Sequence, residues 1–172
     1  ERVLSKAPGM LLEGKMPTVL TRESYVESSE DWWPKWPFNP DIDIEPILFY
    51  ALEHPDIVAK MLQQGIDVQQ GNGFGKTALM YAAQFNLVDT ANLLLQAGAD
   101  VNARTANGTV DWRYAINRGQ RSALMYALEN AGLEMVELLL TAGADPKAKD
   151  TSERDALAYL KSNTAISARE RR

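Results

Sequence analysis

A block of seven residues occurs twice in this chain, and the repetition restricts the fold more than any other feature. Residues 77–83 read TALMYAA and residues 122–128 read SALMYAL. Each block is followed at the same distance by three leucines and then a Gly-Ala-Asp triplet, which begins at Gly98 or Gly143. A weaker copy begins at Pro46. Such units predict a stack in which each one buries its apolar face against the next.

The glycine spacing predicts helix pairs with one insertion. Gly65 and Gly98 are 33 residues apart, whereas Gly98 and Gly143 are 45 apart, so twelve extra residues precede the third unit. These glycines can end second helices in the left-handed conformation. Leu94 and Leu139 hold equivalent places in the apolar stripes of two second helices, so we expect both in the core. Three side chains can cap first helices: Thr77, Ser122 and Asp155.

Two segments carry a resemblance to the ankyrin repeat. Residues 75–83 (GKTALMYAA) and 93–103 (LLLQAGADVNA) match the family patterns G-x-T-P-L-H-x-A-A and L-L-L-x-x-G-A-D-x-N-A. Ala78 replaces the usual proline and Met80 the usual histidine, which weakens the family's local hydrogen bonding. The resemblance implies an all-α solenoid of helix-turn-helix pairs with short β-hairpin loops, one of them lengthened by an insertion.

The predicted organisation has three parts. Residues 1–41 form a non-repeat segment that packs on the first repeat, residues 42–161 hold the repeats, and residues 162–172 form a polar tail. We place the repeats at 42–70, 71–103 and 119–149, with a partial copy at 150–161 and an insertion at 104–118. Three of the four tryptophans lie within 28–40. We expect them to cover the open end of the first repeat, and the alternative is that they anchor a partner.

The insertion carries its own pattern. Asn107-Gly108 is a strong signal for a tight turn, and the residues that follow alternate between apolar and polar. We therefore predict a finger in which residues 101–106 pair with 109–114. Its apolar face either folds back over the neighbouring repeat or presents Trp112 and Tyr114 to a partner.

No motif predicts catalysis, a cofactor or a metal site. The loop at residues 71–77 resembles a phosphate-binding loop, but it has one residue too few between its first glycine and Gly-Lys-Thr. The chain has no cysteine and one histidine, His54, so thiol nucleophiles and thiolate zinc sites are excluded. We therefore expect a non-enzymatic protein without cofactors.

Charge and hydropathy exclude other classes of function. The net charge of −5 argues against general binding of nucleic acid through phosphates. No apolar run approaches the roughly 20 residues of a membrane span. Residues 23–56 contain nine acidic residues and one basic residue, which could steer a basic partner to this end.

The resemblance implies recognition of a partner protein through the concave groove and the hairpin loops. Tyr50, Tyr81, Tyr126 and Tyr159 hold the same place in successive units. In the family this place faces the groove or packs between first helices. The groove candidates are Tyr50, Tyr81, Phe85, Tyr126, Glu129 and Asn130, and the finger candidates are Trp112, Arg113 and Tyr114.

Two further roles stay open. The chain could be an ankyrin segment of a larger multi-domain protein with a structural or regulatory role, or an exported bacterial immunity or inhibitor protein for a toxin or enzyme. It starts at Glu1 without methionine and lacks cysteine, so we favour an exported location such as the bacterial periplasm over the cytoplasm. We expect a monomer when the chain is alone.

Overall fold

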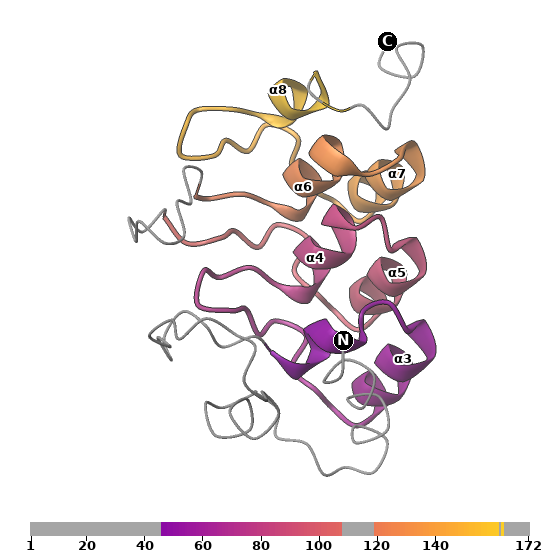
Figure 1. Cartoon of the computed structure of the whole chain (residues 1–172). Helices are drawn as coiled ribbons and strands as arrows, with labels where there is room; N and C mark the ends of the chain where they lie inside the picture. Colours follow the sequence, from indigo (N-terminus) through magenta and orange to yellow (C-terminus); the bar gives the residue numbers. More distant parts are fainter. Residues whose placement is uncertain (1–45, 108–118, 162, 164–172) are drawn as a thin grey trace, which may run out of the picture.

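The computed structural model describes residues 46–107, 119–161 and 163. In these residues the chain forms the all-α repeat solenoid that the sequence predicts (Figure 1). The elements in chain order are η1 (Ile47–Ala51), α3 (Pro55–Gln63), α4 (Ala78–Gln84), α5 (Val88–Gln96), α6 (Ala123–Asn130), α7 (Leu133–Thr141) and α8 (Ala156–Leu160). The predicted roles of residues 1–41 and of the tail after residue 163 lie outside the described residues.

The helices stack in two rows (Figure 1). The first helices η1, α4, α6 and α8 pack on one another in one row, and the second helices α3, α5 and α7 pack in the other. Small residues let the rows approach each other, since Ala82, Ala83 and Ala127 have no exposed surface. The core therefore runs along the stack, between neighbouring pairs and between the two rows.

The predicted core leucines are buried. Leu94 in α5 and Leu139 in α7 are both 0% exposed. Leu140, in contrast, is 43% exposed although its equivalent in the previous repeat, Leu95, is partly buried. The difference arises because α7 packs on α5, whereas no second helix in the described part of the chain packs on the far side of α7.

The helix ends follow the sequence prediction with one exception. Gly65, Gly98 and Gly143 have φ angles of +83°, +88° and +92°, the left-handed conformation expected of them. The side chains of Ser122 and Asp155 accept hydrogen bonds from the backbone N–H groups of residues 125 and 158, so both cap their helices. The prediction that Thr77 caps its helix is wrong, because its hydroxyl has no hydrogen-bond partner. The side chain of Met80, in place of the family's usual histidine, has no N–H group to donate to this hydroxyl.

The loop tips share one turn, built on Asn72, Thr105 and Asp150. The side chain of each accepts a hydrogen bond from the backbone N–H of the residue that precedes the N-cap of the next first helix, namely Lys76, Arg121 or Arg154. Three residues before each first helix begins, the chain adopts a positive φ, at Gly75, Gln120 and Glu153. In the described residues the loops hold one isolated β-bridge, Gly71 to Thr77, rather than extended ladders.

This equivalence locates the insertion. The N–H of Ala106 donates to the carbonyl of Phe74 on one neighbouring tip, and that of Thr151 donates to Gly119 in the same way. Aligning the tips on these contacts makes residues 107–118 the twelve additional ones. Thr105 donates its N–H to the carbonyl of Arg121, and the predicted partner segment of the finger, residues 109–114, lies outside the described residues.

Side-chain amides tie successive loops together. Gln69 donates to the carbonyl of Gly98 and accepts from the N–H of Asp100, and Asn102, 33 residues later, bonds Gly143 and Asp145 in the same way. Each amide replaces two interactions with water by two with the next repeat. The loops are therefore held in register with the helical stack.

Candidate functional site

Tyrosines and cations alternate along the first-helix row, and we call this arrangement the tyrosine–cation ladder. Lys76 Nζ lies 3.7 Å from the ring centre of Tyr81 and 4.6 Å from that of Tyr126. The guanidinium of Arg121 lies 3.9 Å from the Tyr126 ring and 4.9 Å from the Tyr159 ring. Arg154 follows at 4.2 Å from Tyr159. Each of Lys76 and Arg121 thus joins two repeats through attraction between a cation and two ring faces.

Polar partners complete the ladder. Lys76 Nζ, in the loop before α4, donates a hydrogen bond to the side-chain amide oxygen of Gln84, the last residue of α4. Arg121 forms an ion pair with Glu129, which holds the equivalent place in α6. At the last step Arg154 Nε lies 3.4 Å from Asp150 Oδ2, an oxygen that also accepts the Tyr159 hydroxyl at 2.6 Å. The predicted groove residue Glu129 is therefore engaged by the fold itself.

The pKa values in the ladder reflect this packing. Burial raises the pKa of Tyr126 above its ordinary value of 10.0. Burial, followed by the hydrogen bond to Asp150, raises that of Tyr159. Burial also opposes ionisation of Asp150, but hydrogen bonds from Tyr159 and from two backbone N–H groups outweigh it and hold the pKa of Asp150 below 3.8. At neutral pH Tyr126 and Tyr159 are therefore uncharged and Asp150 is ionised.

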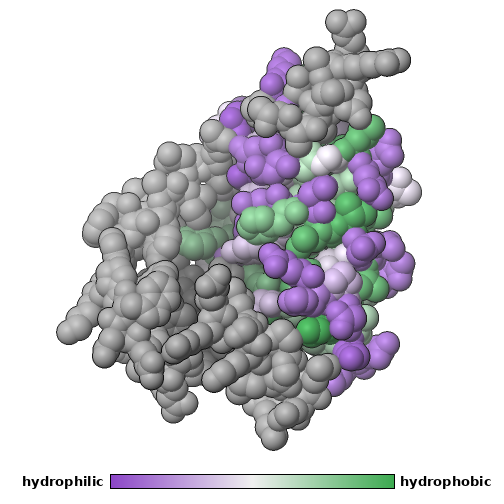
Figure 2. All heavy atoms as spheres, turned by 45° about the vertical axis from the view of Figure 1, so that its right-hand side comes forward, coloured by the Kyte–Doolittle hydropathy of each residue, from purple (hydrophilic) through white to green (hydrophobic). Residues whose placement is uncertain are grey.

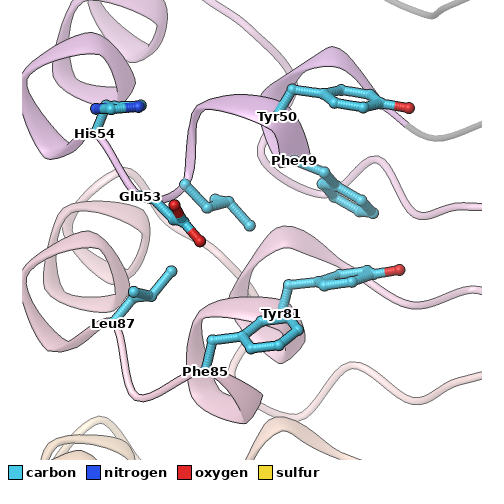
Figure 3. Close-up of a pocket in the computed structure, with 8 residues that line it drawn as sticks. Phe49, Tyr50, Glu53, His54, Tyr81, Phe85 and Leu87 are labelled. Carbon is cyan, nitrogen blue, oxygen red and sulfur yellow. The ribbon is translucent and has the colours of Figure 1, made fainter. Parts of the chain in front are cut away.

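A pocket of about 340 Å³ opens beyond the Tyr81 end of the ladder, between the first and second repeats (Figure 3). Its rings are Phe49 and Tyr50 from η1, Tyr81 from α4, and Phe85 at the C-cap of that helix. The ring centres of Phe49 and Tyr81 are 4.7 Å apart, and Tyr81 stacks on Phe85 at 6.2 Å. The rest of the lining is Leu52, Glu53, His54 and Leu87. We call this the aromatic pocket.

The structure divides the predicted groove residues into two kinds. Tyr50, Tyr81 and Tyr126 are partly exposed, and Phe85 is 59% exposed. Tyr159 is fully buried, so at that step the tyrosine stiffens the stack and offers no surface. Exposed Asn130 donates its side-chain amide to the carbonyl of Tyr126 in its own helix.

Other candidates lie elsewhere. Trp112, Arg113 and Tyr114 lie outside the described residues, as do the tryptophans of residues 28–40. Sequence reasoning missed the ladder cations, although each immediately precedes a first-helix cap residue and that register was visible: Lys76, Arg121 and Arg154. It also missed Glu53 as part of a pocket, because that residue shares no motif with the tyrosines.

The loop that resembles a phosphate site is an ordinary repeat turn. The backbone N–H groups of Phe74, Gly75 and Lys76 all donate to Asn72, so the turn uses the groups that a phosphate would need. Among the described residues no cluster of His, Asp and Glu has the geometry of a metal site. None of their helices has the length and apolar character to cross a membrane.

The outer face of the second helices carries a mixture of apolar and polar side chains. Figure 2 brings this face forward and shows hydrophobic side chains interspersed with hydrophilic ones over α3, α5 and α7. Exposed Leu133 and Leu140 lie on α7. Scattered exposed leucines of this kind are usual on protein surfaces.

The stacked helix pairs and the loop turn that they share define a repeat protein of the α-solenoid class, with the aromatic pocket on its first-helix row. Comparison with family models matches residues 36–105 to "Ankyrin repeats (3 copies)" and residues 119–151 to "Ankyrin repeat". The chain belongs to the ankyrin repeat family. Repeats of this family generally serve as protein–protein interaction modules, and the gap between the two matches contains the insertion.

Proposed function

We propose that the chain is a non-enzymatic module that binds a partner protein through its groove face. This face is the side of the first-helix row on which the aromatic pocket and the partly exposed ladder tyrosines lie, together with the hairpin loops. Family membership supports the general role, and the geometry of the groove supports the location. The fold alone specifies no partner.

The observation that carries the proposal is the exposure of Phe85. Its ring is 59% exposed while its inner side stacks on Tyr81 at the edge of the aromatic pocket. A large apolar ring beside a hollow is the arrangement expected of a binding anchor, because a partner can bury the ring and fill the hollow at the same time. Aromatic anchors of this kind commonly contribute about 2 kcal/mol or more to binding.

Affinity capture from the native source, with mass spectrometry of the retained proteins, tests the proposal. Phe85→Ala should remove the retained partner, because it removes the exposed ring without touching the core. Leu140→Ala is the matched control, since Leu140 is also an exposed apolar residue but lies in the second-helix row. Equal retention by both variants, with unchanged thermal melts, would contradict a groove-face site.

A further inference from the structure

We propose that the aromatic pocket receives a lysine or arginine side chain of the partner protein, with its charge paired to Glu53. This inference rests on the proposed function and names the chemistry that the groove recognises. A volume of about 340 Å³ lies within the range of pockets that hold small ligands or single side chains. Four aromatic rings and one carboxylate are a combination suited to an organic cation.

The electrostatics of the lining favour a cation. Glu53 makes no hydrogen bond or ion pair within the described residues, and the pocket lining contains no lysine or arginine. Asp56 adds a second exposed carboxylate in the first turn of α3. Among the described residues, the pocket lining and the first turn of α3 therefore bring two carboxylates and no lysine or arginine to this end of the groove, whereas Glu129 and Asp150 farther along are paired with the ladder arginines.

The charges around the pocket determine on which side a bound cation would lie. Lys76 already lies over the ring of Tyr81, so its charge opposes a second cation on that ring. Glu53 and His54 come from the turn between η1 and α3, and Figure 3 shows this turn across the pocket from the rings. We expect the incoming charge at Glu53, with the alkyl stem of the side chain lying on Phe49 and Phe85.

A neutral apolar occupant fits the same pocket less well. It would cover the rings but would also remove water from the Glu53 carboxylate without replacing its hydrogen bonds, which is unfavourable. A guanidinium or ammonium covers the same rings and supplies N–H donors to that carboxylate. The difference between the two occupants therefore depends on Glu53, which makes it testable by a single isosteric substitution.

The experiment is an NMR titration of the ¹⁵N-labelled full chain with four small probes: the acetylated amides of arginine, lysine, citrulline and norleucine. We expect saturable shifts of the Phe85 and Leu87 amide signals with the two cationic probes. The neutral probes should bind at least about fivefold more weakly. Glu53→Gln should weaken the cationic probes by a similar factor, whereas Asp56→Asn, which removes an equal charge outside the pocket, should change little.

Several outcomes would overturn the inference. Equal binding of norleucine amide would assign the pocket to an apolar residue. Movement of the same signals on simple dilution would assign it to a second copy of the chain. Unchanged arginine binding in Glu53→Gln would remove the carboxylate from the site. If Phe85→Ala still abolishes partner capture in any of these cases, the proposed function stands and only the cation preference fails.

Discussion

Replacing Leu94 with alanine tests the repeat register and the stacking at once. Leu94 lies on the α5 face of the core and is 0% exposed. The helix packs on α3, α4 and α7, so a cavity at Leu94 has neighbours on several sides. We expect little collapse around the missing side chain, because these neighbours are held by their own stacking contacts.

The size of the effect follows from the burial. The substitution removes three carbons, and at about 0.8 kcal/mol per buried CH₂ the lost transfer free energy is about 2.4 kcal/mol. An unrelaxed cavity adds to this, which gives a loss of about 3–4 kcal/mol in the free energy of unfolding. Leu140→Ala removes the same atoms from a side chain that is 43% exposed, where water fills the space. Its cost should be about 1 kcal/mol or less.

Urea unfolding followed by circular dichroism at 222 nm measures both variants against the parent chain. The slope with urea concentration should stay the same if each variant unfolds in one transition. A loss below about 1 kcal/mol for Leu94→Ala would refute the predicted burial. Equal losses for the two variants would refute the argument that position in the stack decides the cost.

Three other predictions follow from the ladder and the insertion. Asp150→Asn should lower the unfolding free energy by about 1–3 kcal/mol at pH 7. Because the folded state lowers the pKa of Asp150, this contribution to stability is present above about pH 4 and is lost as the pH falls through the folded pKa. Urea unfolding near pH 3 should therefore show a smaller difference between the variant and the parent chain. Since the folded state raises the pKa of Tyr126 and Tyr159, their contribution to the free energy of unfolding is complete below about pH 10 and is lost as the pH rises through their pKa values in the folded state. A melting temperature that stays unchanged up to about pH 11 would contradict this prediction. Deleting residues 107–118 joins Ala106 to Gly119, which already form hydrogen bonds with neighbouring loops, so the melting temperature should hardly change while partner capture is lost. A large drop in stability with capture retained would instead assign the insertion a structural role.

The sequence predicted the features that recur within one unit. The left-handed glycines, the buried Leu94 and Leu139, the cap residues Ser122 and Asp155 and the tyrosine register are all confirmed. Each depends on residues a few positions apart, and those local preferences repeat with the unit. Phe85, a groove candidate from its register at the end of a first helix, is exposed in the structure.

Contacts between units could not be predicted in the same way. Lys76 meets the ring of Tyr126 fifty residues later, and this pairing depends on how far one repeat is rotated and shifted on the next. The aromatic pocket likewise needs Glu53 from one repeat and Phe85 from another. The uncapped Thr77 shows that a correct position in the pattern does not ensure the hydrogen bond.

The sequence by itself therefore determined the repeat unit, its helices and the family, because these arise from short-range residue patterns that recur in each repeat. Only the tertiary structure decided what each equivalent position does. Leu95 and Leu140 hold the same place in the sequence pattern, yet Leu95 is partly buried in the helix that α7 packs on, and Leu140 in α7 is exposed. Burial is a property of a residue's neighbours in space, and those neighbours differ along a finite stack.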